Sequence, residues 1–347
     1  MLSVVSGMMT GVTPTGSTAL DPAAPGAVAA PGAPRTLDAY ADVTRSDAAF
    51  RAFLHGLPGV DQVGAEARAA QLGTRSIKTT AKAWAIDTAI SMVDLTTLEG
   101  ADTPGKVRAL AAKARRPDAT DPGCPPVAAV CVYGDLAGVA TEALAGSGIH
   151  TAAVATAFPS GRASRAVKLA DVRDAVANGA DEIDMVIDRG AFLAGRYLDV
   201  FEEVVAVKEA CGSAHLKVIL ETGELRTYDA VRRASWLAML AGGDFIKTST
   251  GKVSPAATLP VCLVMLEAVR DFRAATGVQI GVKPAGGIKT TKDAVKYLVM
   301  INEVVGPDWL SPDWFRFGAS SLLNDLLLQR QKLRTGHYSG PDHVSVD

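Results

Sequence analysis

Residues 181–223 read DEIDMVIDRGAFLAGRYLDVFEEVVAVKEACGSAHLKVILETG, and this stretch decides the fold. It begins with the short apolar run DEIDMVID (181–188) and ends with a second one, HLKVILETG (215–223). Between them, residues 197–212 have a helical pattern that ends in glycine. The strands are nearly continuous in apolar character, which predicts a parallel sheet covered by helices on both faces.

The same strand-then-helix unit repeats from residue 84 onward. The helical segment 103–115 has a threonine cap and an early proline, and 165–179 ends in Asn-Gly. Eight such units with no GxGxxG after the first strand favour an α/β fold of the closed (β/α)8 type, a TIM barrel, over a doubly wound sheet. The other expected strands are AIDTAISMVDL (85–95), VAAVCVY (127–133), HTAAVATAF (150–158), GDFIKTST (243–250), VQIGVKPAGG (278–287) and WFRFGASS (314–321).

The composition changes outside the predicted barrel. Residues 1–35 are rich in Ala, Pro, Gly, Ser and Thr, so they cannot bury enough surface to offset their ordering entropy. We expect them to be a disordered tail. Residues 36–83 mix apolar and charged residues and are expected to form a helical N-terminal extension, with a poorly ordered extension as the alternative. The barrel is expected over residues 84–333 and a C-terminal tail over residues 334–347.

Charge and composition exclude several classes of protein. The chain has 35 Lys and Arg against 37 Asp and Glu, so its net charge of −2 gives no reason to expect a nucleic-acid partner. No apolar run reaches the roughly 18 residues of a membrane span, and no basic segment precedes the apolar start, so we expect no membrane partner or secretory signal. Four dispersed cysteines without HExxH argue against structural zinc and are typical of reduced thiols in a cytoplasmic protein.

Two lysines are the candidates for chemistry. Lys247 in FIKTSTGK and Lys283 in GVKPAGG lie near the C-terminal ends of neighbouring strands, the face where barrel enzymes react. Burial and a like-charged neighbour both lower the pKa of a lysine. The neutral amine is the nucleophile that forms a Schiff base with a carbonyl substrate; the alternative is a lysine that pairs with a carboxylate. Lys217, at the start of its strand, is expected on the opposite face of the barrel.

Carboxylates and a thiol are expected beside these lysines. Asp184 and Asp188 share one face of their strand, and Asp94 lies at the end of the first. Inward carboxylates could pair with the lysines or relay a proton through water, with a purely structural salt bridge as the alternative. Cys131 is expected to line the pocket as a small core residue.

Three Gly/Ser/Thr-rich segments follow the last three strands: TSTGK (248–252), PAGGIKTT (284–291) and GASSLL (318–323). Glycines let backbone N–H groups approach an anion, and the loops after strands seven and eight are the usual phosphate site of this fold. Lys252 adds a positive charge, while ordinary tight turns are the alternative. The residues therefore predict a barrel enzyme with a lysine nucleophile and a sugar-phosphate pocket. The sequence contains no obvious cluster of metal ligands, which argues against a metal-dependent aldolase.

In their order, several motifs resemble deoxyribose-phosphate aldolase: DLTTL (94–98), GADEIDMVID (179–188), LKVILETGEL (216–225), DFIKTSTGK (244–252), GVKPAGGIKT (281–290) and FGASSLL (317–323). The resemblance implies a class I aldolase that reversibly cleaves 2-deoxy-D-ribose 5-phosphate to D-glyceraldehyde 3-phosphate and acetaldehyde. It implies no metal or organic cofactor. Its partners would be the sugar phosphate, acetaldehyde and further copies of the chain in a homo-oligomer, either a dimer or a tetramer.

The resemblance also implies roles for single residues. Lys247 would form the Schiff base, Lys283 would perturb it, and Asp184 would move protons with an ordered water. Nine residues follow Tyr338, so we do not expect it to act as the terminal tyrosine that many members place in their active site. The rival functions are another Schiff-base aldolase or a transaldolase, and a catalytically silent sugar-phosphate-binding protein. The implied substrate- and phosphate-binding positions are Asp94, Thr96, Cys131, Thr250, Gly251, Lys252, Gly286, Gly287, Gly318, Ser320 and Ser321.

Overall fold

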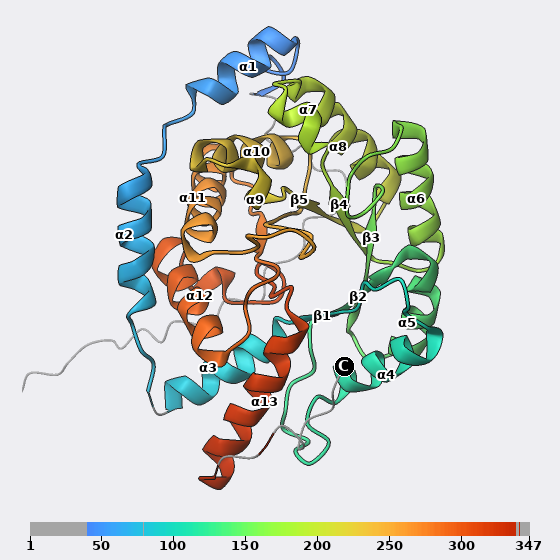
Figure 1. Ribbon diagram of the computed structural model, residues 1–347, viewed down its shortest axis with the longest axis vertical. Coiled ribbons are helices and arrows are strands. Elements are labelled where there is room, and N and C mark those ends of the chain that lie inside the picture. The colour runs from blue at the N-terminus through green and yellow to red at the C-terminus, as the bar shows by residue number, and fades with distance from the viewer. Residues whose placement is uncertain (1–39, 79, 338–339, 341–347) are drawn as a thin grey trace, which may run out of the picture. The chain divides into compact units, whose positions relative to one another are not determined.

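The computed structural model describes residues 40–78, 80–337 and 340 (Figure 1). The described residues all belong to one compact unit. The predicted disordered tail, residues 1–35, lies outside the described residues, and so does Tyr338. Within the described part of the chain no helix is long and apolar enough to cross a membrane.

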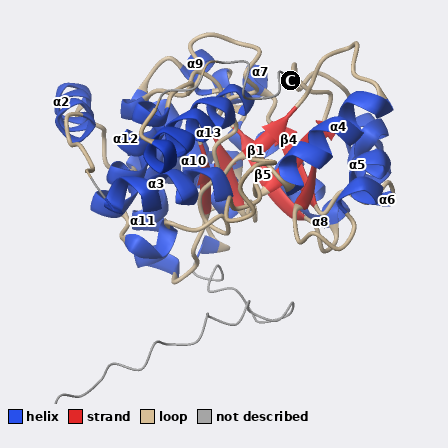
Figure 2. Cartoon of the chain, turned by 90° about the horizontal axis from the view of Figure 1, so that it is seen from below, coloured by secondary structure: helices blue, strands red, loops and turns tan. Residues whose placement is uncertain are grey.

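The centre of the fold is a curled sheet of parallel strands in an α/β arrangement. The strands follow one another in the sheet in the same order as in the sequence, β1 to β7, and every neighbouring pair is parallel. Figure 2 shows them gathered together with helices around them. The strands are β1 (Asp94–Thr96), β2 (Ala129–Tyr133), β3 (His150–Ala155), β4 (Glu182–Val186), β5 (His215–Ile219), β6 (Phe245–Lys247) and β7 (Gly281–Lys283).

The segment 314–318, expected to be the eighth strand, forms isolated parallel bridges and not a regular strand. Phe315 bridges to Val282 of β7, and Phe317 bridges to Val93, directly before β1. The Asp94 backbone N–H donates to the Phe317 carbonyl oxygen over 2.9 Å. Seven of the eight expected strands are therefore regular, and the segment 314–318 bonds to the first and the last of them.

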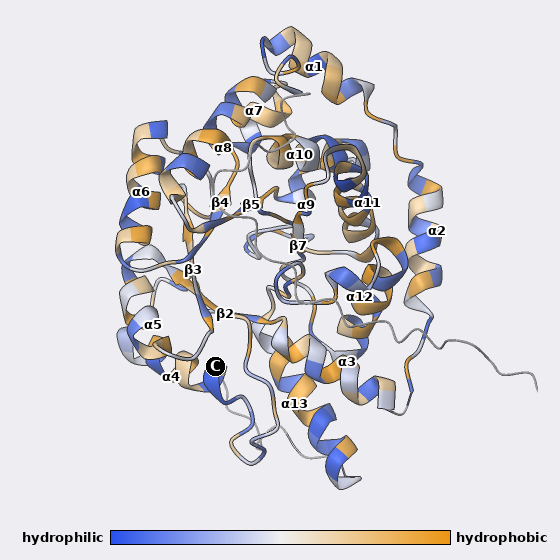
Figure 3. Cartoon of the chain, turned by 180° about the vertical axis from the view of Figure 1, so that it is seen from behind, coloured by the Kyte–Doolittle hydropathy of each residue, from blue (hydrophilic) through white to orange (hydrophobic). Residues whose placement is uncertain are grey.

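Helices connect the strands and lie outside the sheet. The predicted threonine cap is confirmed: the Thr103 side chain accepts from the Lys106 N–H at the start of α4. At α10 the Thr227 side chain likewise accepts from the Ala230 N–H. Figure 3 shows that these helices carry both apolar and polar positions. The helices are α1 (Asp47–Gly56), α2 (Gln62–Gly73), α3 (Thr80–Ser91), α4 (Pro104–Arg115), α5 (Ala137–Leu144), α6 (Arg165–Ala177), α7 (Arg189–Leu193), α8 (Tyr197–Cys211), α9 (Thr222–Leu225), α10 (Tyr228–Leu240), α11 (Leu259–Thr276), α12 (Thr291–Val304) and α13 (Ser320–Thr335), with 3-10 turns η2 (Gly134–Leu136) and η3 (Pro307–Trp309).

The first expected strand, residues 85–95, is wrong over most of its length. Residues 85–91 belong to α3, and only Asp94 and Leu95 of that run lie in β1. The buried residues of α3 are Ala85, Ile86, Ala89 and Ile90, and a spacing of three to four residues is the signature of a helix face. A continuous apolar run cannot by itself distinguish a buried strand from a buried helix.

The N-terminal extension forms an outer layer on one side of the fold. Helix α1 packs against α8 and α10, and α2 packs against α11 and α12 (Figure 1). Phe50 and Leu54 of α1 are fully buried. Two polar contacts secure the extension: the Val60 N–H donates to Asp229 over 2.8 Å, and Arg68 pairs with Glu267 at 2.7 Å. The extension is thus helical and continuous in packing with the helices of the central fold.

Candidate active site

A group of seven buried charged side chains lies on the strands and on the segment 314–318. Each is at most 3% exposed, so none is solvated by bulk water. Burying an unpaired charge is costly, so these groups must compensate one another. We call them the buried charge cluster; its members are Asp94 of β1, Glu182 and Asp184 of β4, Lys217 of β5, Lys247 of β6, Lys283 of β7 and Arg316 of the segment 314–318.

Asp184 is the centre of the cluster because three lysines share its carboxylate. Its Oδ2 accepts from Lys247 Nζ at 2.7 Å and from Lys283 Nζ at 2.8 Å, and its Oδ1 accepts from Lys217 Nζ at 3.0 Å. Strand register explains the meeting, since Asp184 is paired with Lys217 and Lys247 is paired with Lys283. The three residues predicted to do chemistry, Lys247, Lys283 and Asp184, are therefore brought into direct contact.

Arg316 bridges the two remaining carboxylates. Its Nη1 lies 2.8 Å from Asp94 Oδ1, and its Nη2 lies 2.9 Å from Glu182 Oε1. Each of these carboxylates also meets a lysine: Lys283 Nζ is 2.5 Å from Asp94 Oδ2, and Lys217 Nζ is 2.5 Å from Glu182 Oε2. Every acid in the cluster is thus shared by at least two basic groups.

The predicted position of Lys217 is wrong, and two members of the cluster were missed. Lys217 is fully buried beside Asp184 rather than on the opposite face, because β5 begins at His215 and places Lys217 at its centre. Glu182 and Arg316 have no counterpart in the predicted site. The signal was present, since Arg316 stands between two fully buried phenylalanines, Phe315 and Phe317, and a charge inside an apolar run needs a partner.

The cluster divides its lysines into two kinds. Burial lowers the pKa of Lys247, and the charge of Lys283 adds to this effect, although the Asp184 carboxylate opposes it. Burial also acts to lower the pKa of Lys283, but Asp184 and Asp94 outweigh it and the pKa is raised. The pKa of Lys217 is raised in the same way by Asp184 and Glu182. The sequence analysis named burial and the charge of Lys283 together as causes of a lowered pKa. For Lys247, burial is the larger of the two causes.

Uncharged side chains face the cluster from β2 and β3. Cys131 is fully buried in a small apolar group that also contains Leu98, Ala129, Ala152 and Val154. Burial, aided by the nearby Asp184 carboxylate, raises the pKa of the Cys131 thiol and keeps it protonated. Asp188, which the sequence placed on the Asp184 face, lies beyond β4 and caps α7 by accepting from the Ala191 N–H.

The predicted phosphate loops meet at one edge of the sheet. The Gly286 N–H donates to the Gly318 carbonyl oxygen over 3.1 Å. The Ser320 hydroxyl lies 2.7 Å from both the N–H nitrogen and the carbonyl oxygen of Thr96. Gly286 has a φ of +74°, and a Cβ there would lie 2.8 Å from Ala256 Cβ, so only glycine fits this approach.

Two predicted phosphate ligands are engaged by carboxylates. The Thr250 hydroxyl donates to Glu221 Oε2 over 2.5 Å, and the Thr250 N–H points to the same carboxylate at 3.3 Å. Lys252 Nζ pairs with Glu99 Oε1 at 2.7 Å. Gly251 and Gly287 are exposed on these loops, and Ser321 is exposed in the first turn of α13. An anion would therefore meet the glycine and serine backbone directly, and it would compete with Glu99 for Lys252.

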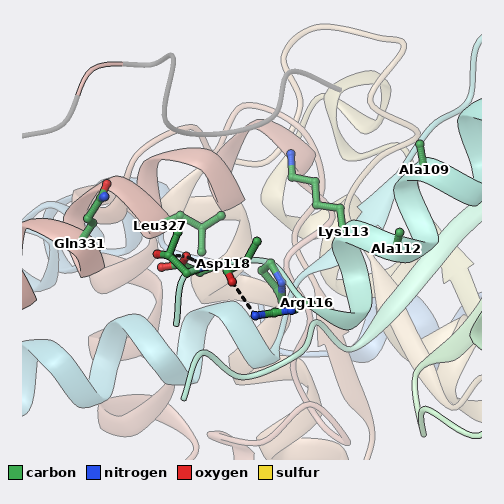
Figure 4. A pocket seen from close by; sticks show the side chains of 10 residues that line it. Ala109, Ala112, Lys113, Arg116, Asp118, Leu327 and Gln331 are labelled. Carbon is green, nitrogen blue, oxygen red and sulfur yellow. Dashed lines mark hydrogen bonds between the residues drawn. The ribbon is translucent and has the colours of Figure 1, made fainter. Parts of the chain in front are cut away.

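Other features of the described residues lie apart from the cluster. A surface pocket of about 360 Å³ is lined by α4 and α13 and includes Lys113, Arg116 and Gln331 (Figure 4). The Arg116 Nη2 donates to the Ala119 carbonyl oxygen at 2.5 Å on its rim. No group of three or more His, Cys, Asp or Glu side chains among the described residues is arranged to hold a metal ion.

Comparisons with known proteins find similarity to aldolases. Residues 88–327 match the family model described as DeoC/LacD family aldolase. The chain is 46% identical over 276 residues to the deoxyribose-phosphate aldolase of Mus musculus, which covers 76% of this chain and 86% of the mouse protein. It is 45% identical over 268 residues to the Homo sapiens deoxyribose-phosphate aldolase, covering 74% and 84% of the two chains.

A solved structure supports the fold alone. It is described as a unique tetrameric structure of deoxyribose phosphate aldolase from Aeropyrum pernix. The two chains are 22% identical with a TM-score of 0.55, and the match covers 78% of this chain and 98% of the other.

Proposed function

The chain belongs to the DeoC/LacD family of aldolases, and from this premise we propose how its buried cluster performs the reaction. The protein is an aldolase, a carbon–carbon lyase, that cleaves 2-deoxy-D-ribose 5-phosphate reversibly to D-glyceraldehyde 3-phosphate and acetaldehyde. The nucleophile is Lys247. One observation carries this choice: Lys217 and Lys283 each pair with two carboxylates, whereas the carboxylate recorded beside Lys247 is that of Asp184 alone. With less compensation for its burial, Lys247 has a lowered pKa.

A neutral Lys247 amine attacks the C1 carbonyl of the open-chain sugar. Loss of water leaves an iminium ion, which is the electron sink of class I aldolases. A base removes the C3 hydroxyl proton, and the C2–C3 bond breaks as its electron pair moves toward the iminium nitrogen. D-Glyceraldehyde 3-phosphate leaves, and the remaining enamine is protonated at C2 and hydrolysed to acetaldehyde and the free lysine.

Asp184 serves this sequence as an ionised carboxylate. Burial acts to raise its pKa, but Lys217, Lys247 and Lys283 together hold it well below the ordinary value. A carboxylate with a low pKa is a weak base when it acts alone. Asp184 therefore stabilises the positive iminium and orients a water molecule that carries the proton, while Lys283 stays charged beside it.

The loops after β6 and β7 and the segment 318–321 bind the phosphate. Support comes from the close backbone approach of Gly286 to Gly318 and from the α13 N-terminus at Ser320. Lys252 supplies a point charge once the phosphate displaces Glu99. The substrate-binding set is the one the resemblance implies, with Asp94, Thr96 and Cys131 at the inner end.

The wider architecture follows the same proposal. The bridges of the segment 314–318 to both ends of the sheet support a closed (β/α)8 barrel over about residues 84–333. The tetrameric description of the Aeropyrum pernix protein supports a homo-oligomer for this chain. The four free cysteines support a reducing, cytoplasmic location.

Trapping with acetaldehyde and borohydride tests the proposal. Mass spectrometry should find one added ethyl group, located on Lys247, and Lys247→Ala should remove it. An adduct on Lys217 or Lys283 would contradict the assignment of the nucleophile. Offering acetaldehyde or dihydroxyacetone phosphate as the donor separates this function from another aldolase or a transaldolase. A silent binding protein would bind the sugar phosphate without turnover.

A further inference from the structure

We propose that six members of the buried charge cluster form a closed, neutral ring, and that the Arg316–Glu182 pair of this ring sets how readily Lys247 loses its proton. The inference rests on the proposed role of Lys247 as the nucleophile. Arg316 makes no contact with Lys247 that would give it a direct part in the reaction; it would act through other residues.

The ring is read from the contacts of each basic group. Lys283 meets Asp184 and Asp94, and Lys217 meets Asp184 and Glu182. Arg316 meets Asp94 and Glu182. Each of these three basic groups therefore lies between two acids, and each acid lies between two of them. In order, the ring is Asp184, Lys283, Asp94, Arg316, Glu182 and Lys217, which returns to Asp184.

Lys247 is the seventh member and stands outside this ring. Within the described part of the chain, its one carboxylate contact is Asp184 Oδ2 at 2.7 Å, an oxygen already shared with Lys283. Three acids and three basic groups balance within the ring, so a charged Lys247 would be an excess positive charge in a buried site. An excess buried charge is relieved when the group becomes neutral. Lys247 is thus the basic group that is least costly to deprotonate.

Few other titratable groups act on the cluster. From β2, Cys131 presents a protonated thiol, since burial and Asp184 raise its pKa. From β3, His150 influences Glu182 and is itself paired with Asp181 at 2.9 Å. Burial opposes ionisation of all three ring carboxylates, yet the basic groups hold the pKa of each below its ordinary value. The ring is therefore charged and balanced at neutral pH.

This balance predicts opposite effects for two single substitutions. Arg316→Met removes a positive charge from the ring, so Lys247 should retain its proton to higher pH. Glu182→Gln removes a negative charge, so Lys247 should lose its proton at lower pH. The double variant, Arg316→Met with Glu182→Gln, restores the balance. A neighbouring buried charge changes a pKa by about one unit or more, and this is the shift expected for each single variant.

The experiment measures the rate of borohydride trapping with acetaldehyde against pH in the full chain. Mass spectrometry identifies Lys247 as the modified residue in each variant. The midpoint should rise in Arg316→Met, fall in Glu182→Gln and return toward wild type in the double variant. Arg316→Lys keeps the positive charge but loses the two-pronged guanidinium group. Because the charge balance is unchanged, the pH midpoint of trapping should match that of the wild type.

A matched control lies outside the cluster. Lys168 of α6 and Glu203 of α8 form another buried ion pair, with Nζ and Oε1 2.8 Å apart. Lys168→Met should lower the thermal midpoint of unfolding without moving the pH midpoint of trapping. This control separates a general loss of packing from a change in the charge balance.

The outcomes are separable. Single variants that shift the midpoint in the same direction, or that trap more slowly with no shift, would overturn the ring and leave Arg316 a structural residue. If Arg316→Met does not fold, Glu182→Gln decides alone: a lower midpoint supports the ring, and an unchanged one overturns it. Absence of a Lys247 adduct in the wild type at every pH would instead overturn the proposed function.

Discussion

The two halves of the curled sheet bury different kinds of side chain. Strand register aligns Cys131 of β2 with Ala152 of β3, and Ala152 with Glu182 of β4, so these residues share one face of the sheet. On β2 and β3 that face carries small uncharged residues. From β4 to β7 it carries acids and lysines. One half thus places small uncharged side chains near the Lys247 amine, and the other half supplies the charges that act on it.

The difference teaches how a lysine can be buried and still react. An apolar wall alone would neutralise every lysine, because burial disfavours the charged form. The charged half prevents this for Lys217 and Lys283, whose pKa values are raised, and leaves only Lys247 with a lowered one. In the proposed mechanism, the acids that Lys217 and Lys283 hold therefore leave Lys247 as the lysine that reacts.

Removing the proposed nucleophile from the charged half should have the largest effect on activity. Lys247→Ala takes away the amine and leaves the apolar half unchanged, so aldol cleavage should fall by about 10³-fold or more. Steady-state assays with 2-deoxyribose 5-phosphate measure the loss. The alanine variant should keep its fold, as circular dichroism would verify, and retention of more than a few per cent of activity would place the nucleophile elsewhere.

Removing the shared acid should have the next largest effect. Asp184→Asn leaves three lysines without their common carboxylate, so we expect a loss of about 10² to 10⁴-fold in kcat. Breaking a buried ion network by removing one partner costs about 3–5 kcal/mol of unfolding free energy. Chemical denaturation measures the second quantity. A variant that is as stable as the wild type would show that the lysines deprotonate together rather than remain charged.

The pH dependence of kcat/KM should report the lowered pKa of Lys247. The amine must be neutral to react, and its neutral fraction grows as pH rises through its pKa. Because the pKa of Lys247 is lowered, the acid limb of kcat/KM should lie below the ordinary lysine value of about 10.4 and fall tenfold per pH unit beneath its midpoint. An acid limb at the ordinary lysine value would contradict the lowered pKa.

The rim above the charged half should distinguish phosphorylated from unphosphorylated substrates. Gly287 has a φ of +81°, where a valine is strained and would crowd an approaching phosphate. Gly287→Val should reduce kcat/KM for 2-deoxyribose 5-phosphate by about tenfold more than for 2-deoxyribose, a difference of about 1.4 kcal/mol.

Gly277→Val is the control for that experiment. Gly277 has a similar φ of +73° but ends α11, and nothing lies within 4 Å of the added Cβ. It should cost stability without favouring either substrate. Equal losses on the two substrates in Gly287→Val would remove this loop from the phosphate site.

The apolar half should tolerate a small change. Cys131→Ala removes a protonated, fully buried sulfur, so it should reduce stability by about 1 kcal/mol through lost packing and change kcat by less than about threefold. Thermal unfolding and steady-state kinetics measure the two effects. A loss of more than about a hundredfold in kcat with unchanged stability would give the thiol a chemical role.

The sequence could predict the residues that interrupt an apolar run at a strand end. Lys247 and Lys283 were found in this way, and Asp184 by the face of its strand; the structure places both lysine Nζ atoms within 2.8 Å of Asp184 Oδ2. The position of a residue along the barrel axis could not be predicted. The strands are shorter than the apolar runs of sequence that contain them, so the sequence does not show where a strand begins or ends. Lys217 was therefore assigned to the wrong face.

Long-range partners were the other gap. The Thr250 hydroxyl donates to Glu221, which lies 29 positions earlier in the chain, and no local pattern indicates that contact. The beginning of the barrel was misread for a related reason, since the apolar residues of α3 satisfy helix and strand periodicities until the packing partners are known.

The position of Arg316 has a consequence for how the chain matures during synthesis. Its partners Asp94 and Glu182 precede it by 222 and 134 positions. A chain emerging from the ribosome begins to fold from its N-terminal end. Until the segment 314–318 emerges, two buried acids lack their arginine and the first and last strands lack the bridges between them. Completion of the sheet and completion of the charge balance thus coincide near the end of translation, so a prematurely terminated chain would have neither.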